Sequence, residues 1–199
     1  MKLALENIKV LDLSRVLAGP YATMILGDLG ADIIKVEMPV KGDDARHYGP
    51  YLNGESAYFM SLNRNKRSIT LNLKKPKGKE IFLEMVKKVD VLVENFRPGT
   101  MEKLGLGYET LQEVNPKLIY ASISGYGHTG PYRTRPSYDA IVQAMSGLMS
   151  ITGQENGRPT RVGTSIGDIT AGLFAAIGIL AALNARHETG KARRLMYPC

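Results

Sequence analysis

Asp168 is the residue whose type and position in this chain are best suited to chemistry. It lies in the glycine-rich stretch 163–172, directly before the apolar run 173–183. The N-terminus of a helix stabilises an anion, and flanking glycines let a bulky partner approach the carboxylate closely. Asp168 is therefore either a carboxylate nucleophile or an ordinary helix N-cap. Position alone favours the N-cap, because aspartate is a preferred residue there.

Residues 95–99, Asn-Phe-Arg-Pro-Gly, are a candidate for ligand binding. They follow a predicted buried strand at 89–94, and ligands of open α/β sheets bind beyond the carboxyl ends of strands. An amide, an aromatic ring and a guanidinium suit an adenine ring and a phosphate. The alternative is a turn in which Phe96 belongs to the core and Arg97 is solvated. The residues alone leave both interpretations open.

Gly125, Gly127 and Gly130 have the G-x-G-x-x-G spacing of dinucleotide-binding loops. The context does not fit, because residues 131–136 contain prolines and arginines where a helix should begin, and no acidic residue stands about twenty positions further on. We therefore expect a loop that lets a ligand pass close to the backbone. A helix is expected to begin within 135–139, where Tyr138 can line a site and Asp139 is a first-turn acid.

The composition predicts a globular domain that favours anionic partners. The chain has 199 residues, 44% of them hydrophobic, which is enough for one domain with a substantial core. A formal charge of +7 favours nucleic acid, acidic lipid or a phosphorylated small molecule. The basic residues within 66–79 lack the interleaved aromatic residues of a nucleic-acid site, so a solvated face with one or two phosphate contacts is the preferred interpretation.

Neither a metal site nor a membrane segment is expected. Cys199 is the single cysteine and the three histidines lack ligand spacing, which predicts no disulfide framework and fits a reducing, cytoplasmic compartment. No secretory signal is visible at the start of the sequence. The apolar run 169–183 is shorter than a membrane span needs and reads as a buried helix.

The order of the predicted elements indicates an α/β fold with a Rossmann-like, doubly wound parallel sheet. A strand at 8–13, a helix at 21–29 and a strand at 31–37 form a βαβ unit, which implies parallel strands. Residues 41–55 read as a loop. Further strands are predicted at 68–73, 89–94 and 118–124, and further helices at 76–88, 138–151 and 169–186. Such alternation is typical of a doubly wound sheet.

Taken together, these segments resemble the family III CoA-transferases, the CaiB/BaiF family that includes formyl-CoA transferase and carnitine CoA-transferase. The matching segments run through nearly the whole chain and are 10–14, 18–20, 29–37, 65–68, 90–99, 124–127 and Gly167-Asp168. The resemblance implies that residues 1–191 are the N-terminal part of the large domain of such an enzyme.

The resemblance also implies a reaction, in which CoA moves from an acyl-CoA thioester to a carboxylic acid through aspartyl anhydride and aspartyl-CoA intermediates, with Asp168 as nucleophile. Holding a weak nucleophile close to the thioester and splitting the exchange into covalent steps lower each barrier. The helix N-terminus is expected to keep Asp168 ionised. Coenzyme A and acyl-CoA are then substrates, with no permanently bound cofactor and with no metal, nucleic-acid or membrane partner.

The family's CoA contacts carry over to three segments and one further lysine. They are Asn72, Leu73 and Lys74; Asn95, Phe96 and Arg97; Lys103; and Arg135, Pro136, Ser137 and Tyr138. Arg97 and Lys103 would meet phosphates of CoA, and Gly19 would belong to the acyl end of the site.

Two further classes remain beside the transferase. α-Methylacyl-CoA racemases of the same family use a histidine where this chain has Tyr138, and a tyrosine with an ordinary pKa of about 10 is a poor base near neutral pH. The transferase is therefore favoured over the racemase. The other class is a CoA-binding fragment without activity.

The end of the sequence departs from the family pattern. Family members are about twice as long, form interlocked homodimers and have a second, smaller domain that is absent from this chain. They continue Gly-Lys-Gly-x-x-Val-Asp-Val-Ser-Met, whereas here Gly190-Lys191 is followed by Ala-Arg-Arg-Leu-Met-Tyr-Pro-Cys at 192–199. A one-base change of reading frame restores the family sequence from suitable codons, so we expect 192–199 to be an aberrant, frameshifted tail. We also expect uncovered apolar surface and weak or absent activity for this chain.

Overall fold

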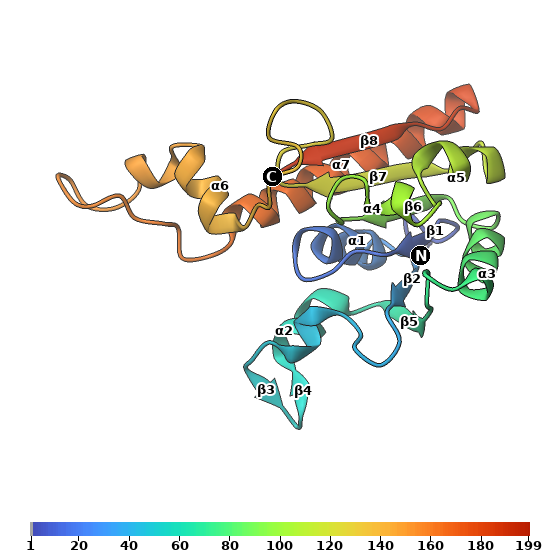
Figure 1. Cartoon of the computed structure of the whole chain (residues 1–199), viewed down its shortest axis with the longest axis horizontal. Helices are drawn as coiled ribbons and strands as arrows, with labels where there is room; N and C mark the ends of the chain where they lie inside the picture. Colours follow the sequence, from blue (N-terminus) through green and yellow to red (C-terminus); the bar gives the residue numbers. More distant parts are fainter. Residues whose placement is uncertain (1) are drawn as a thin grey trace.

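Six parallel strands form the centre of the structure, a computed structural model that describes residues 2–199 (Figure 1). Their order across the sheet is β5-β2-β1-β6-β7-β8. The order runs outward from β1 in both directions, which is the doubly wound arrangement, so the Rossmann-like prediction is confirmed. Ligands of such sheets bind at the point where the order reverses, here between β1 and β6. The strands are β1 Lys9–Asp12, β2 Asp32–Glu37, β5 Lys66–Thr70, β6 Val91–Glu94, β7 Ile119–Ser124 and β8 Arg194–Pro198.

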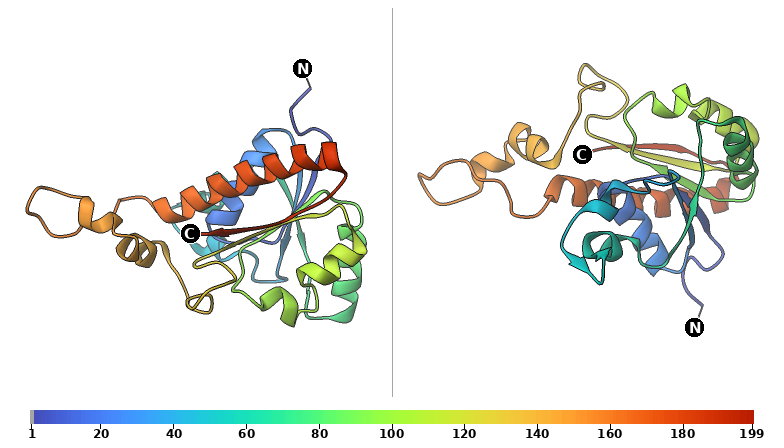
Figure 2. Two further views of the ribbon diagram at one scale, coloured as in Figure 1. Left: turned by 90° about the horizontal axis from the view of Figure 1, so that it is seen from above. Right: turned by 60° about the horizontal axis from the view of Figure 1, so that its bottom comes forward.

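Helices cover both faces of the sheet (Figure 2). Because strand side chains alternate between faces, Val10 and Val91 pack with α1 (Ala18–Asp28) and α7 (Ile166–Thr189). Leu11 and Leu92 pack on the other face with α3 (Pro76–Val86) and α5 (Tyr108–Val114). The predicted βαβ unit is present as β1, α1 and β2.

Helix α7 is longer than the predicted helix and packs closely on α1. A Cβ on Gly172 would lie 2.6 Å from the carbonyl oxygen of Ala18, so the two helices meet where only glycine fits. By length and composition α7 passes as a membrane span, yet 39% of its most apolar window is already buried. One such helix is weak evidence for a membrane segment, because the core helix of a soluble protein passes the same test.

Several short elements differ from the sequence prediction. The predicted loop 41–55 contains η1 (Asp44–His47) and the hairpin β3 (Tyr51–Leu52) and β4 (Glu55–Ser56), and α2 (Ala57–Asn63) follows. Helix α4 spans Thr100–Lys103. The predicted helix 138–151 is interrupted at Gly147, whose φ is +82°, so that it forms α6 (Asp139–Met145) and η2 (Leu148–Ile151). Figure 1 shows α6 lying away from the sheet, near one end of α7.

Two ion pairs are buried near the carboxyl ends of the strands. Lys66 Nζ lies 3.0 Å from Asp12 Oδ2, and Lys35 Nζ lies 2.8 Å from Asp43 Oδ2. The interpretation of the basic residues as a solvated face is therefore wrong for Lys66, because its ammonium group ties β5 to β1. Although burial opposes the shift, Lys66, Lys35 and two hydroxyl groups hold the pKa of Asp12 well below its usual range.

The segment expected to be an aberrant tail forms the edge strand β8. It pairs in parallel with β7, from Tyr120 opposite Arg194 to Ser124 opposite Pro198. The ring of Tyr197 occupies the space beside Gly178 that a larger side chain would fill. A strand here is compatible with either reading frame, so the frameshift stays a prediction.

Candidate CoA site

Two cavities lie over the carboxyl ends of the strands. We call the first the strand-end cavity; it measures about 380 Å³ and lies over β1, β2 and β5. We call the second the Asp168 cavity; it measures about 620 Å³ and lies beyond β6 and β7. Both positions agree with the rule that parallel α/β sheets bind ligands at this edge.

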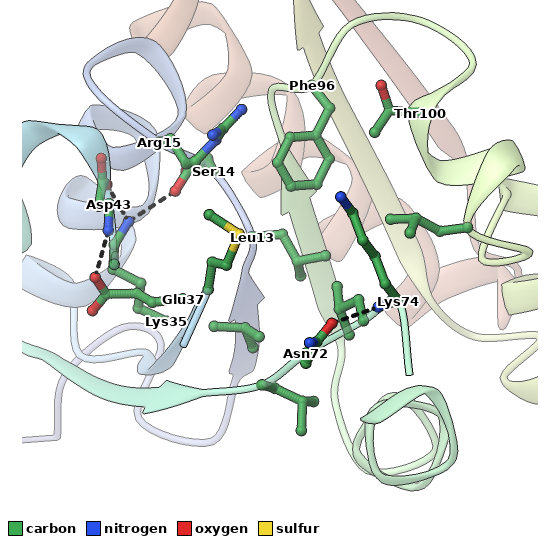
Figure 3. Close-up of a pocket in the computed structure, with 16 residues that line it drawn as sticks. Leu13, Ser14, Arg15, Lys35, Glu37, Asp43, Asn72, Lys74, Phe96 and Thr100 are labelled. Carbon is green, nitrogen blue, oxygen red and sulfur yellow. Dashed lines mark hydrogen bonds and ion pairs between the residues drawn. The ribbon is translucent and has the colours of Figure 1, made fainter. Parts of the chain in front are cut away.

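The strand-end cavity contains four of the residues that the sequence assigns to CoA binding. Asn72, Leu73, Lys74 and Phe96 line it together with apolar side chains from β2 and from the residues directly after β1 and β2. Asn72 Oδ1 accepts a hydrogen bond from Lys74 N at 3.0 Å, which fixes the turn after β5. Figure 3 shows Lys74 and Phe96 on one side of the cavity, opposite the carboxylates of Glu37 and Asp43. An apolar slot with a cation at its edge suits a base ring and a phosphate.

The Asp168 cavity brings together the predicted nucleophile and residues far from it in the sequence. Asn95, Arg97, Ser137 and Tyr138 line it with Asp168. A smaller adjoining cavity of about 170 Å³ adds Arg135 and Pro136. Lys103, at the exposed end of α4, lines none of these three cavities. Gly19 is buried in α1 and lines none of these cavities, and a Cβ there would clash with Ser14.

Asp168 is the third residue of α7 and is not its N-cap. The N-cap is Ser165, which makes no side-chain capping hydrogen bond. The cap is supplied from α6, where Asp139 Oδ1 accepts the hydrogen bond of Gly167 N at 2.8 Å. The N-cap interpretation of Asp168 is therefore wrong, and its carboxylate lines the cavity.

The environment raises the pKa of Asp168 above its ordinary value. Burial is the largest cause, and the neighbouring carboxylate of Asp139 adds to it. The thiol of Cys199, 3.8 Å from Asp168 Oδ1, acts weakly in the opposite direction. These causes act against the helix N-terminus, which is expected to favour the ionised form, so that expectation stays a prediction. A raised pKa makes the ionised carboxylate more basic, which suits a nucleophile.

Gln143 is a buried residue of the site that the sequence did not reveal. Its Nε2 donates to Asp139 Oδ2 at 2.6 Å, and its Oε1 accepts from Val162 N at 2.7 Å. It thereby joins α6 to the segment leading into α7. The position of Gln143 four residues after Asp139, on the same helical face, is the one signal that the sequence offers.

The buried carboxylate of Glu94 shapes the turn that carries Phe96. Its Oε2 accepts the hydrogen bond of Phe96 N at 2.7 Å, and Tyr120 Oη donates to its Oε1 at 3.3 Å. Burial raises the pKa of Glu94 to about 7. The sequence interpretation of 91–94 as a simple buried strand did not assign this role.

No group of three or more histidine, cysteine, aspartate or glutamate side chains suited to a metal ion occurs within residues 2–199. The loop 125–130 begins no helix, as expected from the prolines and arginines of residues 131–136 that follow it, and α6 starts only at Asp139.

Comparison with known proteins agrees with the fold and identifies the family of the chain. The profile described as CoA-transferase family III matches residues 5–197, so the chain belongs to this family. It is 55% identical to succinyl-CoA:glutarate CoA-transferase of Mus musculus, over 94% of this chain and 43% of that protein. It is 56% identical to acetyl-CoA:oxalate CoA-transferase of Acetobacter aceti, over 96% of this chain and 49% of that protein.

A solved structure shows the same fold. A CaiB/BaiF family protein from Brucella suis superposes with a TM-score of 0.95 at 44% identity, covering all of this chain and 53% of that one. The chain therefore spans about half the length of the relatives that it matches.

Proposed function

We propose that this chain carries the nucleophile and much of the CoA site of a CoA-transferase that moves CoA from an acyl-CoA thioester to a carboxylic acid. The observation that carries the proposal is the position of Asp168. Its carboxylate is free of a capping role and faces a cavity shared with Asn95, Arg97 and Tyr138. Arginines at the mouth of this cavity can pair with the phosphates and carboxylates of such substrates.

The proposed exchange proceeds through covalent intermediates on Asp168. The carboxylate attacks the thioester carbonyl, the C–S bond breaks, and a mixed anhydride and CoA thiolate form. The thiolate then attacks the aspartyl carbonyl, which releases the donor acid and leaves an aspartyl-CoA thioester. The acceptor carboxylate repeats these steps in reverse, so that acceptor-CoA forms and Asp168 is regenerated.

The geometry suits a carboxylate nucleophile at this position. Asp139 and Gln143 hold the first turn of α7, so the Asp168 carboxylate is fixed before the substrate arrives, and a fixed nucleophile has less orientational entropy to lose.

Two relatives are named for glutarate and oxalate. Both are dicarboxylic acids, so dicarboxylates are the first acceptors to screen.

The alternative of a racemase finds less support. Tyr138, at the position of the racemase histidine, lines the cavity with Asp168, and a tyrosine is a poor base near neutral pH.

A cytoplasmic location and an interlocked homodimer of the whole protein belong to the same proposal. The exposed apolar surface of α7 supports the homodimer, because a partner subunit could cover it.

Covalent trapping tests the nucleophile. The chain is incubated with succinyl-CoA, and peptides are analysed by mass spectrometry with and without hydroxylamine. We expect a CoA adduct on the peptide that contains Asp168, converted by hydroxylamine to a hydroxamate and lost in Asp168→Asn. Asp32→Asn, which alters a surface ion pair with Arg67, is the matched control and should keep the adduct. Binding of CoA without any adduct would support the fragment without activity.

Genomic DNA tests the proposed frameshift separately. We expect the bases after the codon of Lys191 to encode the family sequence and a second half in a shifted frame. If they encode neither, the tail is native to the protein.

A further inference from the structure

Arg15 lies at the carboxyl end of β1, between the two main cavities. Among residues 2–199 it is the one that lines both the strand-end cavity and the Asp168 cavity. Its guanidinium carbon is 5.4 Å from the centre of the Phe96 ring, and its Nη1 is 3.2 Å from Asp44 Oδ2. The side chain is 47% exposed, so a ligand can reach it. A ligand that occupies both cavities must pass this guanidinium.

The side chain of Asn95 is engaged with the backbone of Arg15. Its Oδ1 accepts from Arg15 N and its Nδ2 donates to Arg15 O, both at 2.8 Å. The side-chain amide of Asn95, directly after β6, thus satisfies both the backbone N–H and the backbone C=O of Arg15. Arg15 follows β1, on the opposite side of the switch point. The carbonyl oxygen and the amide nitrogen of the Asn95 side chain therefore each already make one hydrogen bond to the backbone of Arg15.

The residues on either side of Arg15 are held in the same way. Lys35 Nζ donates to Ser14 O at 2.8 Å, and Asp43 Oδ1 accepts from Val16 N at 3.0 Å. Lys35 and Asp43 are themselves a buried ion pair. Val16 has a φ of +67°, which is a strained conformation for a β-branched residue. Such strain persists where surrounding contacts determine it, and it clusters at ligand sites.

We propose that Arg15 binds the phosphate-bearing middle of a ligand that spans both cavities, and that Asn95, Asp43 and Lys35 are positioning residues that fix its backbone. Guanidinium groups pair with phosphates through two parallel hydrogen bonds, and a backbone fixed in advance reduces the entropy lost on binding. The proposal rests on the proposed function, because CoA is the ligand with this shape. It also reassigns Asn95, which the family resemblance treats as a direct CoA contact.

The first experiment measures CoA affinity of the whole chain by isothermal titration calorimetry. We expect Arg15→Ala to weaken binding at least tenfold, as the loss of a charge-assisted hydrogen bond does. Asn95→Ala should weaken binding to a similar extent. The double variant should bind no more weakly than Arg15→Ala alone, because two changes acting through one residue are not additive.

Asn115 provides a matched control. Its Nδ2 donates to the backbone carbonyls of Val86 and Val89 and its Oδ1 accepts from Lys117 N, at the other end of the sheet. Asn115→Ala likewise removes hydrogen bonds from a side-chain amide to the backbone, so it should lower thermal stability while leaving the CoA affinity within twofold. Similar losses of affinity in Asn95→Ala and Asn115→Ala would show that Asn95 acts through general stability, which overturns the positioning role.

Hydrogen exchange tests the positioning role without any ligand. We expect the amides of Arg15 and Val16 to exchange at least tenfold faster in Asn95→Ala and to be unchanged in Asn115→Ala. Unchanged exchange in Asn95→Ala would overturn the positioning role.

The affinity outcomes separate this inference from the proposed function. Unaltered CoA binding by Arg15→Ala would overturn the role of Arg15, and additive losses would show that Asn95 contacts CoA itself. If the unaltered chain does not bind CoA, the proposed CoA site fails and the ligand role of Arg15 fails with it. The exchange of the Arg15 and Val16 amides still decides whether Asn95 holds the loop.

Discussion

The role and the pKa of the Asp168 carboxylate both depend on a second carboxylate nearby, that of Asp139. Asp139 takes the capping role at α7 and, because it is negatively charged and close, also raises the pKa of Asp168. The cap and the proposed nucleophile are therefore two different residues, whereas the sequence left Asp168 as either a nucleophile or an N-cap. This division leaves the Asp168 carboxylate open to a substrate.

The pH dependence of adduct formation tests this division. A carboxylate must be ionised to attack, so formation of the CoA adduct should fall as the pH drops through the pKa of Asp168. The midpoint should lie above the ordinary value of 3.8. Asp139→Asn retains an acceptor for Gly167 N and removes the charge, so it should move the midpoint to lower pH. The measurement is the initial rate of adduct formation between pH 4 and 8, with Asp32→Asn as control. A midpoint that rises or stays in place in Asp139→Asn would contradict the assignment.

At the scale of elements, the buried pair of Asp12 and Lys66 joins the end of β1 to the start of β5. Removing one partner leaves an uncompensated buried charge, which costs about 3–5 kcal/mol. We expect Asp12→Asn to lower the free energy of unfolding by this amount at pH 7, measured with urea. Asp32→Asn, which alters the exposed pair with Arg67, should cost at most about 1 kcal/mol.

The sign of the pH effect follows from the lowered pKa of Asp12. Its stabilisation is fully present above the unfolded value of 3.8 and is lost as the pH falls towards the lower folded value. The difference between the unaltered chain and Asp12→Asn should therefore shrink below about pH 4. A difference that is constant with pH would contradict a charge effect.

The sequence predicts those elements whose signals are local. The strands β1, β6 and β7 are buried runs bounded by turn residues, and they appear close to their predicted places. The edge strand β5 lies at Lys66–Thr70, earlier than the predicted 68–73, because its mostly exposed side chains give a weak alternating pattern. Helix α6 ends early, because Gly147 adopts a left-handed conformation that the apolar spacing does not reveal.

In the candidate site, too, some residues can be predicted from the local sequence and others cannot. Residues at strand ends, such as Asn95 and Phe96, follow from the rule about carboxyl ends, and the same rule applied to β1 would have indicated Arg15. The capping of α7 by Asp139 joins residues 28 positions apart, and the hold of Asn95 on Arg15 joins residues 80 apart. Neither contact leaves a local pattern, so only the assembled fold shows them.

At the scale of the whole molecule, α7 presents an apolar face that nothing within residues 2–199 covers. Phe174 and Ile177 are 63% and 59% exposed, and Leu173 beside them is 39% exposed. The chain spans about half the length of its relatives, and we expect a second copy of the chain to cover this face. Exposed apolar patches of this kind drive association.

Sedimentation velocity tests that expectation. The chain alone should self-associate as its concentration rises, and Phe174→Lys with Ile177→Lys should shift it towards monomer, because two ammonium groups cannot be buried at such an interface without counter-charges. Ile81→Lys, which alters an isolated exposed side chain on α3, should leave the association unchanged. Circular dichroism shows whether the double variant keeps its helices.

A folded double variant that associates as strongly as the unaltered chain would place the contact elsewhere. Binding of the unaltered chain to neutral lipid vesicles would instead indicate that a membrane covers α7.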